Sequence, residues 1–243
     1  MIDRLVTTSD FHGHAPEVHP PDGDLLTVHG DCTDHGNQGE VEEFFNWVVH
    51  QAPRYTHGVV FIAGNHDKSF DRRRRTAFPE SYHWFEATMA DFLRTPNVYY
   101  LENSGVEIDG VKIWGSPYTP WFNGDKWAFN VHRGPDSYDI WQLIPEGTDI
   151  LITHGPVMGK LDYFLGPMDF QLPYKGCEQL KQRVEEIKPK LHLCGHIHTA
   201  HGMTRDAHTF YLNSCMVDNS LQLAHKPLTI SCKSLLTDLD SWV

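Results

Sequence analysis

The sequence GVVFIAGNHD, residues 58–67, joins an apolar run to a short polar turn. The apolar run predicts a buried strand, because short apolar runs bounded by turn residues are typical of strands inside a sheet. The turn then presents Asn65, His66 and Asp67. The same arrangement recurs in four other stretches: RLVTTSDFHG (4–13), DLLTVHGDCTD (24–34), TDILITHGP (148–156) and KLHLCGHIH (190–198). These repeated strand ends predict a sheet whose loops carry polar side chains.

Helical periodicity separates several of these runs. Apolar residues recur at helical spacing in residues 39–53 and 177–190, and residues 82–96 form a third candidate helix. Asp109 and Gly110 stand between two strand-like runs and predict a hairpin. Strands that alternate with helices indicate parallel units, and the hairpin adds antiparallel pairing. We therefore expect an α/β fold with mixed sheets, in one domain over residues 1–243.

Composition excludes several classes of partner. The net charge of -12 argues against nonspecific binding of long nucleic acid, which requires a protein to neutralise many phosphates. No apolar run approaches the roughly 18 residues that a membrane helix needs, and the N-terminal sequence MIDRLVTTSDFHG does not resemble a signal peptide. The five cysteines include no Cys-x-x-Cys pair, so we expect a reducing cytoplasm. The sequence carries no signal for an oligomeric state.

Residues able to bind metal ions follow five of the predicted strands. Each pattern alone has an ordinary explanation, since Asp and Asn often satisfy turn backbone and a single histidine often lies in a core. Together, and each after a strand-like run, they favour a common site, because ligands of open α/β sheets gather beyond the carboxyl ends of strands. The candidates are Asp10, His12, Asp31, Asp34, Asn65, His66, His154, His196 and His198.

The ligand types point to a pair of divalent ions. Carboxylate, imidazole and amide oxygen suit Mn, Fe or Zn, and no thiolate is needed. Two ions roughly 3.5–4 Å apart can bridge a hydroxide and polarise a phosphoryl group. At a regular strand end, alternate residues face the same way, so one backbone could present both His196 and His198. His192, inside the apolar run, is expected to be structural, while His201 either touches substrate or closes a turn.

The order Asp-x-His, Gly-Asp-x-x-Asp, Gly-Asn-His-Asp, His and Gly-His-x-His, from Asp10 to His198, resembles the calcineurin-like metallophosphoesterase superfamily. The stretches GSPYTPWFNGDKWAFN and KPKLHLCGHIHTAHG resemble the branch of the mammalian metallophosphoesterase-domain brain proteins and their bacterial relatives. The resemblance implies a four-layer α/β/β/α sandwich of two mixed β-sheets flanked by helices. It also implies two divalent metal ions, with Mn²⁺ expected to support activity in vitro and Fe or Zn as alternatives.

The resemblance also implies a role for each candidate. One ion would be bound by three residues: Asp10, His12 and His198. The other would be bound by three more: Asn65, His154 and His196. Asp31 would bridge the ions, and His66, oriented by Asp34, would protonate the leaving oxygen after a metal-bridging hydroxide attacks phosphorus.

The branch is associated with hydrolysis of phosphodiesters, so we expect a metal-dependent phosphodiesterase whose substrates are small phosphodiesters or nucleotides, including 2′,3′- or 3′,5′-cyclic nucleotides. Protein phosphatases have Arg where this chain has His35 in TDHGN, which weakens the case for a phosphomonoester. A phosphomonoesterase or protein phosphatase and a non-catalytic nucleotide-binding scaffold remain alternatives. The candidate substrate contacts are His35, Asn123, Trp127 and His201.

Two further segments have open interpretations. Arg72 to Arg75 form either a solvated loop or helix face or a local phosphate clamp. The aromatic segment 117–141 forms either a hydrophobic cluster under a loop or a rim over the metals. Both interpretations of the aromatic segment can hold together.

Overall fold

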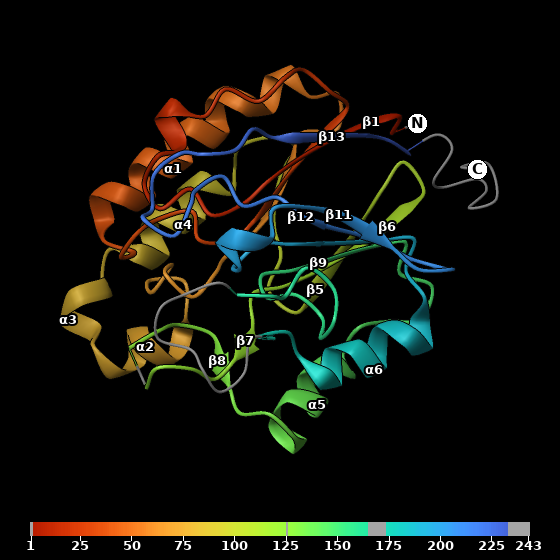
Figure 1. The fold of residues 1–243 in the computed structure, drawn as a ribbon. Helices are drawn as coiled ribbons and strands as arrows, with labels where there is room; N and C mark the ends of the chain where they lie inside the picture. The colour runs from red at the N-terminus through yellow and green to blue at the C-terminus, as the bar shows by residue number, and fades with distance from the viewer. Residues whose placement is uncertain (1, 125, 165–173, 233–243) are drawn as a thin grey trace.

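Two β-sheets lie face to face in the computed structural model, which describes residues 2–124, 126–164 and 174–232, and helices cover their outer faces (Figure 1). The first sheet is parallel apart from its antiparallel edge strand β13. Its strands, in spatial order, are β13 (Leu228–Ser231), β1 (Arg4–Thr8), β2 (Leu25–His29), β3 (Val59–Ile62) and β4 (Val98–Tyr100). The predicted strands in residues 4–13, 24–34 and 58–67 therefore pair as neighbours.

The second sheet has a parallel centre and antiparallel strands at both edges. Its order is β11 (Gly202–Arg205), β12 (Phe210–Asn213), β10 (Leu191–Cys194), β9 (Ile150–Thr153), β6 (Val111–Ser116) and β5 (Ser104–Ile108). Asp109 and Gly110 join β5 to β6 with φ angles of 53° and 79°. Positive φ at both central residues is the requirement of a type I′ hairpin turn, and β5 pairs antiparallel with β6, so the predicted hairpin is confirmed.

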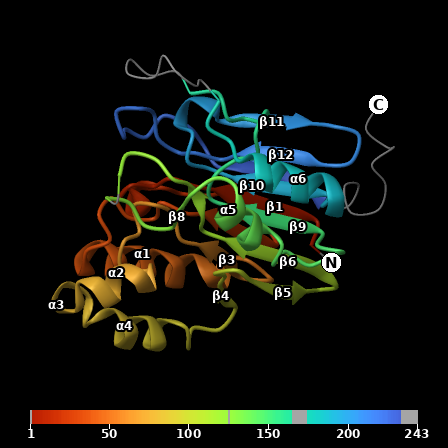
Figure 2. The ribbon, with the colours of Figure 1, turned by 90° about the horizontal axis from the view of Figure 1, so that it is seen from below.

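Helices flank the two sheets on opposite sides. The first sheet is covered by α1 (Gln38–Gln51) and α4 (Phe85–Phe92), and the second by α5 (Pro135–Trp141) and α6 (Glu178–Ile187). Figure 2 shows α5 and α6 lying over the strands of the second sheet. Shorter elements complete the chain: α2 (Arg72–Ala77), α3 (Pro79–Tyr82), η1 (Ala15–Glu17), η2 (Ala52–Arg54), η3 (His198–Ala200), β7 (Thr119–Pro120) and β8 (Asn130–Val131).

Three apolar interiors lie between the four layers. Phe44 and Val48 of α1 pack on the first sheet with Phe61 of β3. Between the sheets lies a second buried cluster: Leu5, Leu25, Val60, Ile113, Ile150 and Leu193. The third joins Leu180 of α6 and Trp141 of α5 to the second sheet. Alternate residues of the central strands thus face different interiors, and the expected four-layer α/β/β/α sandwich is confirmed.

The three predicted helices correspond to α1, α6 and α4, with small shifts at their ends. Asn37 caps α1, and its side chain accepts a hydrogen bond from the amide of Glu40 at 3.1 Å. α4 begins three residues later than the predicted helix 82–96. Among the described residues, no helix is long and apolar enough to cross a membrane.

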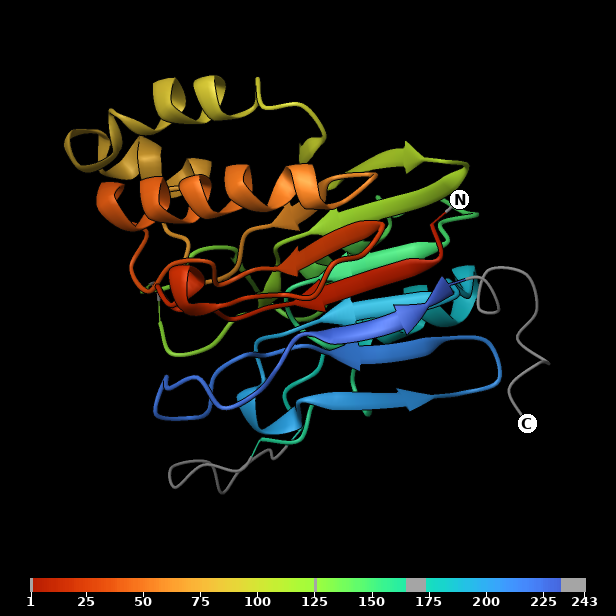
Figure 3. The same ribbon diagram turned by 90° about the horizontal axis from the view of Figure 1, so that it is seen from above.

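Both sheets send the carboxyl ends of their parallel strands to the same side of the molecule. Figure 3 shows β1 and β2, in red and orange, running in the same direction as β10 and β12, in blue. A bridge between Ser9 and Cys215 joins the chain just after β1 to the chain just after β12. The loops with the predicted ligands therefore leave both sheets at one edge of the sandwich.

Candidate metal centre

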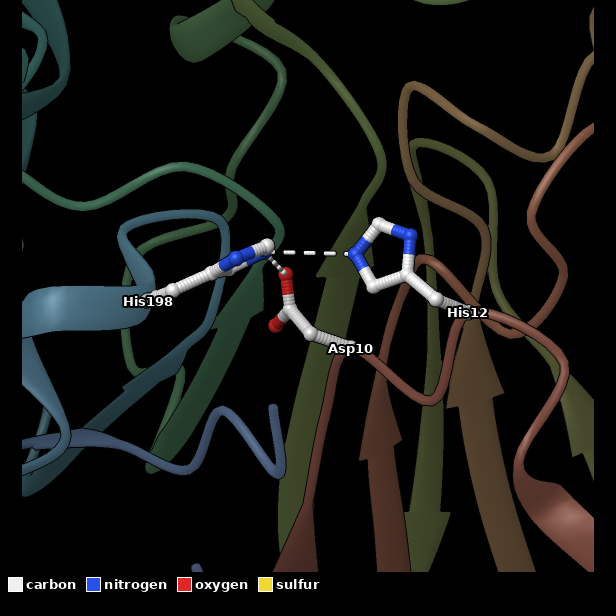
Figure 4. Close-up of side chains that lie close together, drawn as sticks. All are labelled: Asp10, His12 and His198. Carbon is white, nitrogen blue, oxygen red and sulfur yellow. Dashed lines mark hydrogen bonds and ion pairs between the residues drawn. The ribbon is translucent and has the colours of Figure 1, made fainter. Parts of the chain in front are cut away.

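The first group of ligands combines the loop after β1 with the loop after β10. Asp10, His12 and His198 offer ligand atoms that lie within 4.8 Å of one another. Nε2 of His198 is 3.3 Å from Oδ1 of Asp10 and 3.2 Å from Nε2 of His12 (Figure 4). These are the three residues that the resemblance assigns to one ion.

The second group lies beside the first, and the carboxylate of Asp31 lies close to residues of both. Ligand atoms of Asp31, His154 and His196 lie within 4.8 Å of one another. Nε2 of His154 is 3.2 Å from Oδ2 of Asp31 and 3.0 Å from Oδ1 of Asn65. Oδ2 of Asp31 is also 3.7 Å from Nε2 of His12, so this carboxylate lies between the two groups. All seven expected metal ligands are thus brought together.

Ring tautomers leave the right nitrogens for metal ions. Nδ1 of His154 lies 2.9 Å from the carbonyl oxygen of His29, and Nδ1 of His198 lies 3.1 Å from that of Asp218. A carbonyl only accepts, so in the neutral ring each Nδ1 carries the proton and each Nε2 keeps its lone pair for a metal ion. Metal-binding histidines commonly hold their second nitrogen in this way. With buried carboxylates beside them, these donors fit divalent ions of the Mn, Fe or Zn type.

The ligands sit on bent backbone rather than on regular strands. The φ angles are 55° at Asp10, 45° at His12, 49° at Asp31 and 68° at His196. Residues other than glycine rarely adopt this left-handed region, and such strain concentrates at functional sites. β10 ends at Cys194, so strand alternation is not what directs His196 and His198 to the same place. The expectation that strand alternation presents both histidines was therefore wrong, because the left-handed bend at His196 turns the chain after the strand has ended.

Two glycines allow the ligand loops to touch. A Cβ atom on Gly64 would overlap Oδ1 and the backbone nitrogen of Asp31, and one on Gly195 would overlap Oδ2 of Asp10. The backbone of the loop after β3 therefore lies against Asp31 in the loop after β2. In the same way, the backbone of the loop after β10 lies against the side chain of Asp10 in the loop after β1. Asp67 secures the first of these contacts, because its buried carboxylate accepts hydrogen bonds from the amides of Gly64 and Thr33.

Charges in this region compensate one another although they are buried. Burial raises the pKa of the Asp10 carboxyl, but the hydrogen bond and charge of His198 and the charge of His154 outweigh burial and lower it. Burial lowers the pKa of His154, yet the Asp31 carboxylate reverses this and raises it to about 9. Burial, with the charge of His154 as a second cause, lowers the pKa of His196 to about 3. Two buried carboxylates thus attract positive charge, which divalent ions would supply.

His66 stands at the edge of both groups, and its ring is held by the loop after β2. Its Nδ1 lies 2.7 Å from the main-chain oxygen of Asp34 and 3.3 Å from the carboxylate of the same residue. The rings of Trp127 and His12 each lie with centroids 4.3 Å from the His66 ring. Asp34 therefore does contact His66 as expected, and the shorter contact is with the main chain.

A cavity of about 380 Å³ opens in front of these residues. Its wall on the metal side includes Asp31, Asn65, His66, His196 and His198, and the remaining wall is largely aromatic, with Trp121, Phe122, Trp127, Phe164 and Tyr174. Phe122 lies 5.2 Å from the His196 ring and 6.1 Å from that of Trp127, by centroids. Arg133 and Lys175 add positive charge to the wall. This volume suits a small ligand.

The four candidate substrate contacts separate in the structure. Trp127 lines the cavity, whereas His35 and Asn123 are exposed and, with His201, are not part of its wall among the described residues. Nδ1 of His35 lies 2.9 Å from the Asp34 carboxylate. Nδ1 of His201 lies 2.9 Å from the carbonyl oxygen of Cys215, and its ring stacks on His225. The structure thus brings only Trp127 of these four to the cavity.

Both segments with two alternative interpretations, Arg72 to Arg75 and the aromatic segment 117–141, contribute to the structure of the protein. Arg73 pairs with Asp71, and Arg75 donates to the main-chain oxygens of Ser69 and Phe70, so the arginines of α2 brace the loop after β3. The aromatic segment divides between the two interpretations. Phe129 and Trp141 are buried in the core, while three others line the cavity: Trp121, Phe122 and Trp127.

Some residues of the site have no local signal in the sequence. Tyr174, Lys175 and Arg133 reach the cavity only through the fold, and Cys215 reaches Asp10 from the loop after β12. The apolar run TFYLNSCM predicts the strand before Cys215, but a thiol after a strand carries no pattern of its own. The signal for Tyr174 and Phe164 is their aromatic character alone.

Comparisons with known proteins agree with this geometry. The metallophosphoesterase domain-containing protein 1 of Homo sapiens is 35% identical over 238 residues, which cover 93% of this chain and 70% of that protein. A UPF0046 protein of Caenorhabditis elegans is 34% identical and matches 93% of this chain and 59% of its own length. The crystal structure of phosphopantetheinyl hydrolase from Mycobacterium tuberculosis superposes with a TM-score of 0.57 at 14% identity, over 90% of this chain and 91% of that one, and shows a shared fold.

The sequence profile of the calcineurin-like phosphoesterases matches residues 4–200, which include every residue of the two ligand groups. The profile, the curated relatives and the four-layer fold lead to one assignment. This chain belongs to the calcineurin-like phosphoesterase family.

Proposed function

We propose that this chain, as one domain over residues 1–243, is a dinuclear metal-dependent phosphodiesterase that hydrolyses small phosphodiesters, with 2′,3′- or 3′,5′-cyclic nucleotides as candidate substrates. The observation that carries the proposal is the shared carboxylate of Asp31. It lies between two groups of ligands at the floor of an aromatic cavity. A carboxylate in this position could bind both ions of a two-metal phosphoesterase site, in which the ions lie about 3.5–4 Å apart.

The ligand assignment follows the two groups. Asp10, His12 and His198 would bind one ion, and Asp31 would contribute to both. Asn65, His154 and His196 would bind the other. Two divalent ions in these positions supply Lewis acidity toward a phosphoryl group and activate water as the nucleophile. Mn²⁺ is the ion we expect to support activity in vitro.

His66 is the proposed general acid. Its ring lines the cavity, and Nδ1 is held by Asp34, so Nε2 is the atom left to face a substrate. Protonated His66 would donate the Nε2 proton to the departing oxygen. Asp34 would orient the ring and stabilise its charge through the carboxylate 3.3 Å from Nδ1.

The cavity wall supports a substrate with a planar group. Phe122 and Trp127 present nearly parallel rings, 19° apart, next to the metal side of the cavity. Aromatic rings of this kind stack on a nucleobase or an aryl group. His35, at the position where protein phosphatases have Arg, is exposed and pairs with Asp34. This observation favours a diester, which has one negative charge, over a monoester dianion.

The test of the acid compares leaving groups in a His66→Ala variant. General acid catalysis typically supplies about 10²–10⁴-fold, and a good leaving group needs little of it. We expect hydrolysis of bis-(4-nitrophenyl) phosphate to fall modestly, and hydrolysis of a cyclic nucleotide, with its alkoxide leaving group, to fall by about 10²-fold or more. Bound Mn²⁺ should not change, and His208→Ala, at an exposed position, is the matched control. An equal loss on both substrates would contradict the role of His66.

The test of the reaction type uses the parent protein. The ratio of kcat/KM for an aryl phosphodiester to that for an aryl phosphomonoester should exceed one with Mn²⁺ bound. A preference for the monoester would favour a phosphomonoesterase or protein phosphatase. Tight binding of nucleotide by the metal-loaded protein, with no hydrolysis of any phosphoester, would favour a non-catalytic scaffold and overturn the proposal.

We also propose a cytoplasmic location. All five cysteines lie in the part of the chain that the structure describes, where they are buried and form no disulfide. Unpaired cysteines are typical of reducing compartments and support this location.

A further inference from the structure

Asn213, the last residue of β12, and the loop that follows it, residues 214–218, pack against the first ligand group. The match to the family profile ends at residue 200, so this loop lies outside it. Sγ of Cys215 is 3.0 Å from Oδ2 of Asp10, and both side chains are fully buried. A carboxylate only accepts, so the thiol is the donor. Asp10 thus has one oxygen on Cys215 and the other, Oδ1, 3.3 Å from Nε2 of His198.

Asn213 connects the same loop to the backbone that carries the histidine ligands. Its Nδ2 donates to the main-chain oxygens of Gly195 at 3.2 Å and Ile197 at 2.9 Å. Its Oδ1 accepts the amide of Cys215 at 3.0 Å. Asn213 is fully buried, and these three hydrogen bonds use both ends of its amide. One side chain therefore sets the distance between Cys215 and the turn on either side of His196.

The end of the loop holds a second ligand of the group, His198. The carbonyl oxygen of Asp218 lies 3.1 Å from Nδ1 of His198. The carboxylate of Asp218 accepts hydrogen bonds from the amides of Ser220 at 2.7 Å and Gln222 at 3.1 Å. These bonds fold the chain after Asp218 back onto the loop. Cys215 and Asp218 thus contact two of the three ligands of the first group, and Asn213 orders the turn that joins the two groups.

We propose that Asn213, Cys215 and Asp218 form an outer shell that sets the metal affinity of the Asp10, His12 and His198 group, with Cys215 as the positioning residue for Asp10. The inference rests on the proposed metal-dependent function. Cys215 and the amide of His196, which lies 2.9 Å from Oδ1 and 3.0 Å from Oδ2, together hold the carboxylate so that Oδ1 faces His198. Without the thiol, Oδ2 would keep only the amide that it shares with Oδ1, and the carboxylate would be less firmly oriented. Outer-shell partners of this kind typically change metal affinity by about 10–100-fold when they are removed.

The test measures metal binding directly. Ion-free parent and variants are titrated with Mn²⁺ at fixed pH, and free Mn²⁺ is followed by electron paramagnetic resonance. Cys215→Ala should weaken one of two binding steps by about 10–100-fold and leave the other within a few-fold of the parent. Cys215→Ser keeps a donor at this position and should restore most of the loss. Cys232→Ala, a buried cysteine that contacts neither ligand group among the described residues, is the matched control.

A second measurement separates positioning from direct ligation. Parent protein loaded with Co²⁺ should show no sulfur-to-cobalt charge-transfer band in the near ultraviolet, because Cys215 donates to Asp10 and does not bind the ion. Such a band, absent from Cys215→Ser, would overturn the positioning role. Unchanged Mn²⁺ binding in Cys215→Ala would overturn it too, and so would equal losses in the Ala and Ser variants. If Cys215→Ala does not fold, Cys215→Val, which fills the space without a donor, takes its place.

The outcomes remain distinct from those of the proposed function. A parent that binds two ions, loses one step in Cys215→Ala and yet hydrolyses no phosphoester would keep this inference and overturn the phosphodiesterase. If the parent hydrolyses phosphodiesters and the Cys215 variants bind Mn²⁺ as the parent does, the phosphodiesterase would stand and the role of Cys215 would be overturned. Asn213→Ala provides an independent variant, which we expect to weaken the same binding step.

Discussion

His192 makes the stability of the fold sensitive to acid. The side chain is fully buried in β10, and its Nε2 lies 2.7 Å from Oγ1 of Thr153. Thr153 donates its own proton to the carbonyl of Gly155 at 2.6 Å, so Nε2 carries the proton of the neutral ring. Nδ1 has no hydrogen-bond partner among the described residues. Burial, with the charge of His29 as a second cause, lowers the pKa of His192 to about 3.

The sign of the effect follows from proton linkage. The unfolded chain has the ordinary histidine pKa of 6.5, so between pH 6.5 and 3 the unfolded state binds a proton that the folded state does not. The contribution of His192 to stability is therefore present above pH 6.5 and is lost as the pH falls toward 3. Between pH 7.5 and pH 5.0 the linkage relation gives a loss of about 2 kcal/mol from this residue.

His192→Leu removes the titrating group. At pH 7.5 we expect the variant to lose about 0.5–1.5 kcal/mol of unfolding free energy with the Thr153 hydrogen bond. The parent loses about 2 kcal/mol of unfolding free energy between pH 7.5 and pH 5.0 through His192, and the variant does not. The difference in unfolding free energy, variant minus parent, should therefore be about 2 kcal/mol more favourable to the variant at pH 5.0 than at pH 7.5. Urea unfolding of the ion-free proteins at both pH values measures this difference, and His208→Leu, at an exposed position, is the control. Parallel pH dependence of the parent and His192→Leu would refute the reasoning.

Two further substitutions test the packing of the site. Gly64→Ala should lower the unfolding free energy by about 1–3 kcal/mol and reduce bound Mn²⁺, because the new Cβ overlaps the Asp31 carboxylate and backbone. Gly39→Ala in α1, whose Cβ would meet only Oδ1 of Asn37 at 3.5 Å, should be neutral or stabilising by up to about 1 kcal/mol in the same urea titration. Trp127→Ala should raise KM for aryl and nucleotide diesters by the equivalent of about 1–3 kcal/mol of stacking, with Mn²⁺ binding retained. Steady-state kinetics with Trp84→Ala as control checks this, and an unchanged KM would exclude Trp127 from the substrate contacts.

The fold and the ligand groups could be predicted because they share one cause. Asp31, Asn65 and His154 each follow a short apolar run, and the parallel pairing of β1, β2 and β3 and of β9 and β10 brings those ends to one edge. Periodicity identifies the strands, and strand direction then determines where their last residues meet. The apolar pattern therefore carries information about the site as well as about the core.

The local geometry of the ligands was less predictable from periodicity. His196 and His198 reach the site through a left-handed bend and a short 3₁₀ turn, which alternation along a strand does not describe. His35 is a candidate substrate contact because it stands where protein phosphatases have Arg, and Asn123 because it lies in the aromatic segment. Asn123 instead occupies a left-handed turn position with φ of 50° and is exposed. Sequence adjacency to a ligand does not specify the direction of a side chain, because one bend in the backbone reverses it.

The outer wall of the cavity depends on contacts between residues far apart in the chain. The guanidinium of Arg133 donates to the carbonyl oxygens of Lys175 at 3.1 Å and Gly176 at 2.8 Å, and it pairs with the carboxylate of Glu178. These contacts join the end of the aromatic segment to the start of α6, and no short motif records them. In the proposed mechanism, hydrolysis would depend on the ligands at the strand ends, whereas the choice of substrate would depend on this wall, since specificity arises from differences in contacts outside the reacting centre. The type of reaction can therefore be inferred from sequence motifs sooner than the substrate can.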